Sequence, residues 1–573
     1  MGVANKNAKA MTPQQQMEFA VTLKREPSMS SSCNSTPLHP RSSQDADLGD
    51  DDGTPVGATL DVYMGDADPF PLPVDSEHKA RKMKLFSFAP PHMLAFHLSW
   101  FSFFATFVSS FAPAPLLPVI RDNLDLTGRD IGNAGTASVA GSIASRLVIG
   151  ALCDLVGPRY ACAFLLLLTA PAVFTLASVS TATGFIVSRF LIGLSLGSFV
   201  TCQFWMSSMF SAEVVGTVNG TTAGWANLGG GASLLIMPLV YHLIEGPMGF
   251  DRFVAWRIAF VVPGFIQVLS ALLVLVLGQD LPDGNYQELK VKGEQNTDTA
   301  WKVIFYAVIN PKTWVFALSY GYCFGVELTV DNILTSYFFD RFDLPLHTAG
   351  VVASTFGLAN IVTRPFGGYL SDWMAQNLGM RGRLWALWSV QTAGGMACIF
   401  LGRIGHLAGT IVVMIVFSCF AEMAAGATFG VIPFISRRSL GVISGIVGAG
   451  GILGAVLTQL IFFTSSAYST ETGISLMGIM IICCTFPIIG VYFPQWGGML
   501  RPASTSPSAT EEAYYLREWS QEEQRQGMHL ASLKFAENSR GERGKRVAPQ
   551  PVLNPMSSSA TLALGAGVQY KMA

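Results

Sequence analysis

Long apolar runs separated by short polar segments fill the middle of the chain, from about residue 94 to residue 494. The runs reach about 20 residues, the length that an α-helix needs to cross the hydrocarbon layer of a membrane. The pattern therefore predicts an all-α integral membrane protein whose core is surrounded by the lipid bilayer. The twelve predicted spans are residues 94–120, 131–153, 160–180, 183–205, 217–243, 254–278, 313–338, 348–371, 384–402, 408–432, 440–464 and 474–494.

Charged residues are scarce and unevenly distributed. They make up 13% of the 573 residues, whereas a typical soluble protein has about 25%. Of the 36 basic and 38 acidic residues, 21 lie in residues 1–92 and 16 in residues 496–573. This distribution excludes one large soluble enzyme, a nucleic-acid-binding protein and a disordered scaffold. It predicts a membrane-embedded core between two polar tails.

An even number of spans places both tails on the same side of the membrane. Among the segments that connect or flank the predicted spans, those on the side of the tails carry fourteen lysines and arginines. Those on the opposite side carry six arginines and no lysine. Because basic residues accumulate on the cytosolic side, we expect both tails in the cytosol. The predicted parts are a disordered N-terminal tail (1–92), two six-helix bundles (93–278 and 313–495), a cytosolic central loop (279–312) and a C-terminal tail (496–573).

The two predicted bundles repeat one motif. The pattern Arg-x-x-x-Gly-x-Leu-x-Asp ends the second span at residues 146–154 and the eighth span at residues 364–372, 218 positions later. The fifth and eleventh spans both open with Gly-x-x-x-Gly, at Gly216 and Gly441. Both relations correspond to a shift of six helices. Duplicated halves around a central site are typical of secondary transporters.

The repeat contains a pair of arginines, Arg146 and Arg364, inside predicted membrane helices. A charge at mid-bilayer costs at least about 2.5–3.5 kcal/mol, so such residues usually serve a function. The relation between the halves predicts that both arginines face one central cavity. A guanidinium group presents a planar fork of donors that matches a planar oxyanion, which favours a small anionic substrate. The alternative is that each arginine pairs with a helix end or a carboxylate and locks the cytosolic side.

Other polar residues also fall in apolar surroundings: Asn227, Glu327, Asp331, Glu422 and Arg189. Asn227 needs a hydrogen-bond partner, and an anion is one candidate. Burial disfavours the charged form of a carboxylate, so the three acidic residues are candidates for carrying protons. The alternative is pairing with nearby arginines or a position at a wet helix end. Arg189 opens the fourth span, where a structural role is equally compatible with its position.

Glycines crowd the fifth and eleventh spans, where they allow helices to approach closely and to slide. The candidates for such packing or gating are Gly224, Gly229, Gly230, Gly448, Gly451 and Gly454. The chain has no GxxxxGK[ST] loop for ATP, and none of its nine cysteines has metal-ligand spacing. We therefore expect a transporter driven by an ion gradient, with no enzymatic activity, metal or cofactor.

Several segments resemble a known family. Residues 150–159, Gly-Ala-Leu-Cys-Asp-Leu-Val-Gly-Pro-Arg, resemble the loop signature of the major facilitator superfamily and include Asp154 and Arg159. Residues 223–231, Ala-Gly-Trp-Ala-Asn-Leu-Gly-Gly-Gly, and residues 448–451, Gly-Ala-Gly-Gly, resemble the paired nitrate signatures of its nitrate/nitrite porter family. The segments that resemble the eukaryotic high-affinity nitrate transporters of plants and algae are 96–104, 320–332, 514–523 and 534–539.

The resemblance implies the major facilitator fold and high-affinity, proton-coupled nitrate uptake at the plasma membrane by alternating access. In that family two arginines clamp the nitrate, and they correspond to Arg146 and Arg364. The other family positions near the anion correspond to Asn227, Tyr320, Phe324 and Phe204. Many plant and algal members need a single-pass accessory membrane protein, which is therefore a further expected partner.

Two positions depart from the family signatures. Ala226 replaces a glycine of the first signature, and Ile452 replaces an asparagine of the second. The side-chain amide of that asparagine is absent here, and its loss would change the affinity for the anion or the preference between nitrate and nitrite. A nitrite-selective porter or a nitrate/nitrite exchanger is therefore an alternative.

A nitrate sensor that signals through its tails is an alternative of another class. The observation behind this alternative is the Ser- and Pro-rich composition of residues 28–45 and 501–510. Such composition is typical of disordered tails with regulatory phosphorylation. We expect the tails to fold little, apart from a short polar helix near residues 511–526.

Overall fold

A computed structural model of the protein describes residues 70–291, 300–464 and 468–545. These residues belong to one compact unit, Ala67–Ala573. The predictions made for residues 1–69, including their disorder, lie outside the described residues.

The first group of helices begins at His92, after the polar N-terminal segment. Its boundaries follow local sequence signals: Thr127 caps α4 in a capping box with Asp130, and Pro158 occupies the first turn of α5. The helices of this group are α2 (His92–Phe111), α3 (Pro113–Leu124), α4 (Gly128–Val156), α5 (Pro158–Thr175), α6 (Ala182–Leu194), α7 (Ser198–Met209), α8 (Val215–Glu245), α9 (Arg252–Ala259) and α10 (Val261–Leu277).

The second group repeats this arrangement after the central loop. Asn310 caps α13 and Ser469 caps α20 through their side chains. The helices of this group are α13 (Pro311–Gly321), α14 (Phe324–Phe342), α15 (Leu346–Leu358), α16 (Asn360–Leu378), α17 (Met380–Leu401), α18 (Leu407–Thr428), α19 (Leu440–Gln459) and α20 (Thr470–Thr485).

Ten helical stretches within the described residues are long and apolar enough to cross a membrane. They coincide with ten of the twelve predicted spans. The other two predicted spans, 313–338 and 348–371, coincide with the helix pairs α13–α14 and α15–α16, which are interrupted over one or two residues. Charged residues such as Glu327 and Arg364 lower the hydropathy of these pairs. The predicted all-α membrane architecture is confirmed.

The two groups meet where the backbone of one lies against glycines of the other. α4 packs on α19, and α8 packs on α16. A Cβ atom at Gly368 would lie 2.0 Å from the carbonyl oxygen of Gly216, and one at Gly150 would lie 2.4 Å from that of Gly441. Only glycine permits such contacts, so the repeated glycines form the crossing points of the two groups.

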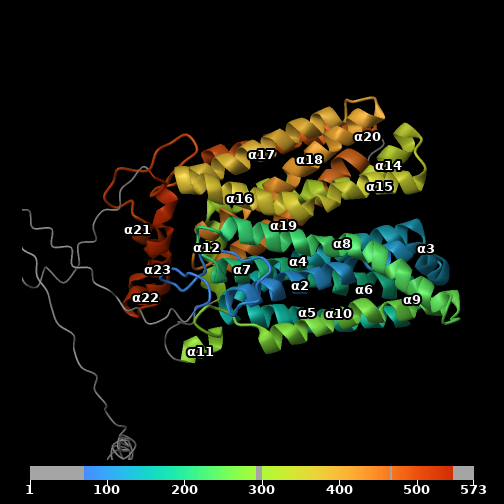
Figure 1. The fold of residues 1–573 in the computed structure, drawn as a ribbon, viewed down its shortest axis with the longest axis horizontal. Coiled ribbons are helices and arrows are strands. Elements are labelled where there is room, and N and C mark those ends of the chain that lie inside the picture. The colour runs from blue at the N-terminus through green and yellow to red at the C-terminus, as the bar shows by residue number, and fades with distance from the viewer. Residues whose placement is uncertain (1–69, 292–299, 465–467, 546–573) are drawn as a thin grey trace, which may run out of the picture. The chain divides into compact units, whose positions relative to one another are not determined.

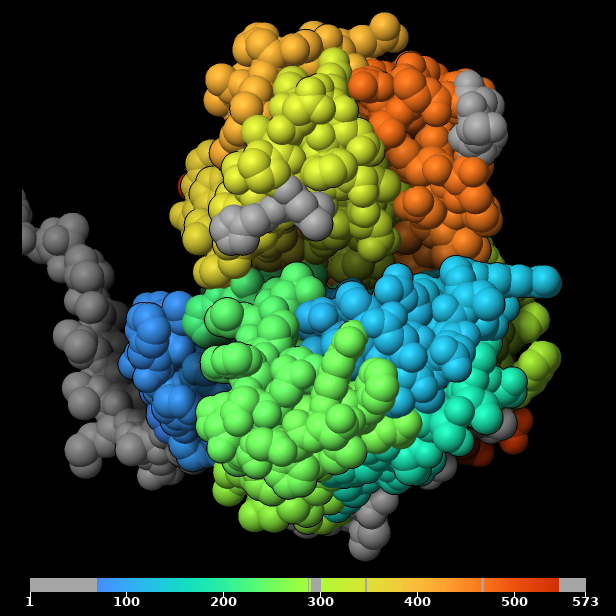
Figure 2. Space-filling model, turned by 90° about the vertical axis from the view of Figure 1, so that its right-hand side faces the viewer, coloured from blue at the N-terminus to red at the C-terminus, as the bar shows by residue number. Residues whose placement is uncertain are grey.

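The two groups of helices lie side by side and touch through α4 and α19 and through α8 and α16. Figure 1 shows α2–α10 (blue to green) beside α14–α20 (yellow to orange). Figure 2 shows the same groups meeting along a seam, seen from the end away from α21–α23. The limits of the two predicted bundles, 93–278 and 313–495, remain predictions.

The C-terminal tail folds further than predicted. The predicted helix near 511–526 corresponds to two short helices, but the expectation that the rest of the tail folds little is wrong. Tyr515 and Phe535 are buried, at 0% and 6% exposure, and hold a cluster of short helices together. The Tyr515 hydroxyl also donates to the carbonyl oxygen of Phe434, 3.1 Å away. The elements of this cluster, hereafter the C-terminal cluster, are α21 (Glu511–Leu516), α22 (Gln521–Arg525), α23 (Leu530–Asn538) and the 3-10 helix η6 (Ser539–Arg543).

The predicted disorder of the N-terminal tail does not extend to residues 70–91. The amide of Ala80 donates to the carbonyl of Met209, and the amide of Ser211 donates to the carbonyl of Ala80, both at 3.0 Å. The central loop is also partly helical. Its elements are α11 (Tyr286–Val291) and α12 (Ala300–Ile309), and a two-stranded ribbon, β1 (Tyr492–Phe493) and β2 (Gly497–Gly498), follows α20.

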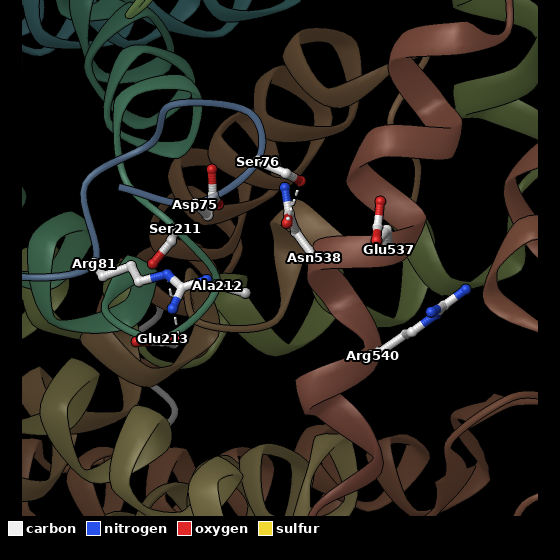
Figure 3. Close-up of a pocket in the computed structure, with 9 residues that line it drawn as sticks. All are labelled: Asp75, Ser76, Arg81, Ser211, Ala212, Glu213, Glu537, Asn538 and Arg540. Atoms are coloured by element: carbon white, nitrogen blue, oxygen red, sulfur yellow. Dashed lines mark hydrogen bonds and ion pairs between the residues drawn. The ribbon is translucent and has the colours of Figure 1, made fainter. Parts of the chain in front are cut away.

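A cavity of about 360 Å³ lies between residues 75–81, the α7–α8 connection and the C-terminal cluster. Figure 3 shows Arg81 beside Glu213 and Ser76 beside Asn538, which bridge the edges of this cavity. The Ser76 hydroxyl donates to the Asn538 side chain across 2.7 Å. Both signs of charge line the cavity, so it does not resemble a site for a small anion.

Candidate functional site

Arg146 and Arg364 lie at equivalent crossing points of the two groups of helices. Their exposed fractions are 0% and 1%. Gly445 of α19 allows the backbone of Arg146 to approach, and Gly220 of α8 does the same for Arg364, because a Cβ would lie 2.4 Å and 2.6 Å from the respective carbonyl oxygens. Both guanidinium groups face the ring of Phe324, at 5.5 Å and 5.3 Å from its centroid. The structure therefore brings the two predicted arginines to one place.

Aromatic rings fill the space between the arginines. Tyr320 and Phe324 stack with centroids 5.3 Å apart. Phe199 of α7 stacks on both of them, at 5.8 Å and 6.3 Å. The ring of Phe429 meets Tyr320 edge-on at 5.3 Å. These apolar faces exclude water and strengthen electrostatic interactions with the arginines.

Arg146 has no ion-pair partner among the described residues. Its Nη1 donates to the carbonyl oxygen of Gly448, 2.6 Å away, and its guanidinium lies 4.7 Å over the ring of Phe199. Its Nε has no hydrogen-bond partner within the described residues. Arg146 thus offers a buried positive charge with an unused donor.

Arg364 is surrounded by polar groups. Its Nη2 donates to the Tyr320 hydroxyl at 2.9 Å, and its Nη1 lies 3.3 Å from Glu327 Oε2 and 3.6 Å from Glu422 Oε2. The side chain of Asn360, one helical turn earlier, accepts a weaker bond at 3.4 Å. The Nε of Arg364 has no hydrogen-bond partner within the described residues.

The two carboxyl groups beside Arg364 differ in their hydrogen bonds. Glu327 Oε1 accepts from Asn360 at 2.8 Å and from Asn227 at 3.3 Å, while Oε2 accepts from Arg364. Glu422 is fully buried, and neither of its oxygens has a hydrogen-bond partner within the described residues. The hydrogen-bond partner of Asn227 in the structure is therefore Glu327, whereas the sequence analysis had named an anion as a candidate.

Three predicted site residues lie apart from this cluster. Asp331 is exposed one turn along α14 from Glu327. Arg189 donates to the carbonyl oxygen of Ser110, 2.6 Å away, which is a contact inside the first group of helices. Phe204 is buried, but it lies five residues beyond Phe199 on α7 and so faces another direction at about 100° per residue.

The predicted glycines serve mainly close packing. A Cβ at Gly451 would lie 2.8 Å from the ring of Tyr320, and one at Gly448 would lie 3.1 Å from that of Phe199, so both shape the aromatic site. A Cβ at Gly224 would meet the carbonyl oxygen of Asn360 at 2.6 Å. Gly229 and Gly454 touch backbone of α2 and α13, whereas Gly230 has only ordinary contacts.

The repeated aspartates hold the halves together at one end. Asp154 accepts from the amides of Gly441 and Val442 at the start of α19, both at 2.9 Å. Asp372 accepts from the amides of Gly216 and Thr217 at the start of α8, at 3.0 Å and 2.6 Å. A carboxylate at a helix N-terminus satisfies free amides and the helix dipole.

Arg159 holds the segment that follows α10. Its backbone amide donates to Asp280 and its guanidinium to Asn285, both at 2.9 Å. Burial raises the pKa of Asp280, although Arg159 opposes this effect.

Sequence reasoning missed Phe199, Phe429 and Asn360. The two phenylalanines fall in apolar runs without any distinguishing neighbour. Asn360 lies four residues before Arg364, one helical turn away, and this spacing is the signal that could have found it.

The model of the Major Facilitator Superfamily matches residues 99–459. A high affinity nitrate transporter of Arabidopsis thaliana is 59% identical over 84% of this chain and 96% of its own length. Nitrate transporter 2.1 of Chlamydomonas reinhardtii is 50% identical over 83% of this chain and 88% of its own length. The nitrate/nitrite transporter NrtP of Nostoc punctiforme is 26% identical over 76% of this chain and 99% of its own length.

Solved structures agree with this fold. The E. coli fucose:proton symporter FucP has a TM-score of 0.53 at 14% identity and covers 69% of this chain and 98% of its own. The proton:xylose symporter XylE has a TM-score of 0.53 at 12% identity and covers 69% and 94%. The chain belongs to the Major Facilitator Superfamily. Within it, the chain belongs to the family that contains these plant and algal nitrate transporters.

Proposed function

We propose that the protein is a secondary active nitrate transporter that takes up nitrate together with protons by alternating access. The observation that carries this proposal is the pair of buried arginines at the crossing of the two halves. Both face Phe324, and both have an unused Nε donor. The names of the relatives support nitrate as the anion.

In the proposed binding mode, nitrate lies between Arg146 and Arg364. Each guanidinium offers planar donors to the planar anion, and Phe199, Phe324 and Tyr320 shield it from water. Nitrate also lowers the repulsion between the two cationic sites. Asn227 and Phe204 are secondary candidates for contact in other states of the cycle.

The glycine crossings support the proposed motion. Close packing of α4 on α19 and of α8 on α16 lets one half rock on the other without displacing side chains. The contacts of Asp154 and Asp372 with helix N-termini close one end of the pathway. We propose that this end is cytosolic, because the basic residues of the connecting segments gather there.

We further propose a plasma-membrane location with both termini in the cytosol. In this proposal the tails are residues 1–92 and 496–573, the two bundles are residues 93–278 and 313–495, and the central loop is residues 279–312. A single-pass accessory subunit is a proposed partner for delivery or activity.

The test is uptake of labelled nitrate into cells that lack their own nitrate transport. The parent chain, Arg364→Lys and the matched control Arg403→Lys are compared, with and without a co-expressed accessory subunit. Lysine keeps the charge but loses the fork, so we expect saturable uptake in the parent and the control and its loss in Arg364→Lys. Normal uptake by Arg364→Lys at equal surface delivery contradicts the clamp.

Nitrite is the second candidate substrate, because a relative is named for both anions. Ile452 is buried in the apolar core and supplies no amide to the site. Nitrite is therefore included as competitor and as labelled substrate. Stronger inhibition by nitrite than by unlabelled nitrate would assign the site to nitrite.

A further inference from the structure

Glu422 on α18 lies beside Arg364 without a hydrogen bond. Its exposed fraction is 0%, and both carboxyl oxygens lack a partner within the described residues. The distance of 3.6 Å to Arg364 Nη1 exceeds a normal hydrogen bond. An ionised carboxylate buried without hydrogen bonds carries a large desolvation cost, whereas a protonated carboxyl does not. The surroundings of Glu422 therefore fit the neutral acid.

Glu327, in contrast, has the surroundings of an ionised carboxylate. Its two oxygens accept from Asn360, Asn227 and Arg364, at 2.8, 3.3 and 3.3 Å. Both oxygens of Glu327 are thus used as hydrogen-bond acceptors. The pair combines one carboxyl group that accepts three hydrogen bonds with one that accepts none and lies 3.6 Å from Arg364.

The ionisable groups around this pair come from several elements. α16 contributes Arg364, and α14 contributes Glu327 and, one turn away, the exposed Asp331. Across the aromatic stack lies Arg146 on α4. Tyr320 and Cys323 complete the set next to Arg364, while α19 has no acidic or basic residue between Leu440 and Gln459.

We propose that Glu422 carries the proton that is transported with nitrate; this inference rests on the proposed function. Arg146 and Arg364 supply two positive charges and Glu327 one negative charge. With Glu422 protonated, the site has one excess positive charge and binds one nitrate to neutrality. With Glu422 ionised, the empty site is already neutral.

This charge balance produces coupling, because an unbalanced buried charge is expensive. Two forms of the site are neutral: the empty form with ionised Glu422, and the nitrate form with protonated Glu422. These two forms change between the outward and inward states at low cost. Movement of nitrate without the proton, or of the proton without nitrate, leaves a net charge between the halves.

The proton follows a balanced path through this cycle. On the outer side a hydronium ion gives its proton to a Glu422 oxygen, which forms the O–H bond and leaves water. Nitrate then displaces the carboxyl from Arg364. On the cytosolic side nitrate leaves first, and the Glu422 O–H bond breaks in favour of a water molecule. The ionised Glu422 then pairs with Arg364 for the return.

The test uses the full chain, with its accessory subunit if uptake requires one, reconstituted into liposomes with labelled nitrate. Two quantities are measured: nitrate counterflow at equal pH on both sides, and nitrate accumulation driven by a pH step of about one unit. Each proton that enters with a nitrate contributes up to about tenfold accumulation in the parent, since a tenfold proton gradient is worth about 1.4 kcal/mol. The variants are Glu422→Gln, Glu422→Asp and the control Glu537→Gln, which changes an exposed side chain of α23.

Glu422→Gln mimics the protonated acid permanently. We expect it to keep counterflow within about threefold of the parent, because the nitrate form remains neutral, and to lose accumulation completely. Glu422→Asp should recover part of the accumulation, and Glu537→Gln should match the parent.

Three results would overturn the proposal. Accumulation by Glu422→Gln at the level of the parent would place the proton elsewhere. Loss of counterflow together with accumulation, in a monodisperse and normally melting protein, would make Glu422 a structural residue. A parent without any nitrate counterflow would contradict the proposed function itself, and the inference with it.

Discussion

The two arginines of the repeat occupy equivalent positions but have different chemical surroundings. Arg146 meets a carbonyl oxygen and an aromatic face. Arg364 meets the carboxylate of Glu327 and the Tyr320 hydroxyl. One half therefore supplies a fixed positive charge, and the other supplies a charge that carboxylates can balance. The two halves therefore differ chemically in these few side chains.

Replacing Tyr320 by phenylalanine tests how the hydroxyl positions Arg364. Tyr320→Phe removes the acceptor of Nη2 and leaves a buried charged donor unsatisfied, at a cost of about 1–3 kcal/mol. We expect the KM for nitrate to rise at least about fivefold at unchanged surface delivery. Tyr369→Phe, on the exposed face of α16, is the matched control. An unchanged KM in Tyr320→Phe would show that the hydroxyl does not position the guanidinium.

The sequence was most informative at charged or polar residues that lie within apolar segments. A charge in an apolar helix, repeated after 218 positions, identified Arg146 and Arg364, and the structure brings them together. Phe199 and Phe429 could not be identified, because a phenylalanine among apolar residues has no such contrast with its surroundings. Whether Phe199 or Phe204 faces the arginines depends on the rotation of α7 about its axis. The sequence predicts a helix end only to within a few residues, so it does not define this rotation.

At the scale of helices, the glycines decide how closely the halves approach. A matched pair on α8 tests this role. A Cβ at Gly220 would lie 2.6 Å from the carbonyl oxygen of Arg364, whereas one at Gly230 would make only ordinary contacts, from 3.7 Å. Gly220→Ala should displace α16 and cost about 1–3 kcal/mol, as overpacking does.

We expect Gly220→Ala to melt at a lower temperature and to lose most nitrate uptake, and Gly230→Ala to resemble the parent. Thermal unfolding in detergent and uptake in cells measure the two effects. Equal melting temperatures and uptake for Gly220→Ala and the parent would mean that the crossing tolerates a side chain, contrary to the packing that the structure shows.

The twelve spans could be predicted because length and hydropathy suffice for a membrane helix. The breaks between α13 and α14 and between α15 and α16 could not, since hydropathy and length do not reveal an interruption of one or two residues. The C-terminal cluster was missed for another reason. Its helices are too short to show periodicity, and they fold by burying Tyr515 and Phe535 against other parts of the chain.

At the scale of the whole described unit, the C-terminal cluster joins the two halves. Arg383 of α17 binds Glu542 through Nε and Nη2, at 2.9 Å and 2.8 Å, and Asp372 through Nη1 at 2.6 Å. Its Nη2 also donates to the carbonyl oxygen of Ala212 in the first half, 2.7 Å away. Glu542 thus orients the arginine that holds Asp372 against the start of α8.

Glu542→Gln should loosen this end of the molecule. A hydrogen bond between charged groups is worth about 1.5–3 kcal/mol, so amide exchange at Gly216 and Thr217 should accelerate about tenfold or more. Hydrogen–deuterium exchange of the first turn of α8 measures the effect. Glu537→Gln serves as control because the exposed Glu537 makes no ion pair among the described residues. An unchanged rate of amide exchange in Glu542→Gln would show that the C-terminal cluster does not stabilise the contact between Asp372 and the start of α8.

The docking of the C-terminal cluster should also depend on pH. Burial raises the pKa of Glu518 from 4.5 to about 7, against hydrogen bonds from Ser436 and Arg438. The docked state therefore binds a proton that the free segment releases, and docking weakens as pH rises from about 4.5 to about 7. Burial also raises the pKa of Glu542, in spite of Arg383, so this residue acts in the same direction.

After correction for intrinsic rates, we expect faster amide exchange in α22 and α23 at pH 7.5 than at pH 5.5, and a smaller difference in Glu518→Gln. The amide side chain stays neutral at both pH values, so it removes the titration while it keeps an acceptor for the Arg438 backbone amide, which bonds Glu518 at 3.2 Å. The same pH dependence in Glu518→Gln and the parent would assign the effect to another group. A loss of protection on acidification would reverse its sign, because the docked state would then be the one that releases protons.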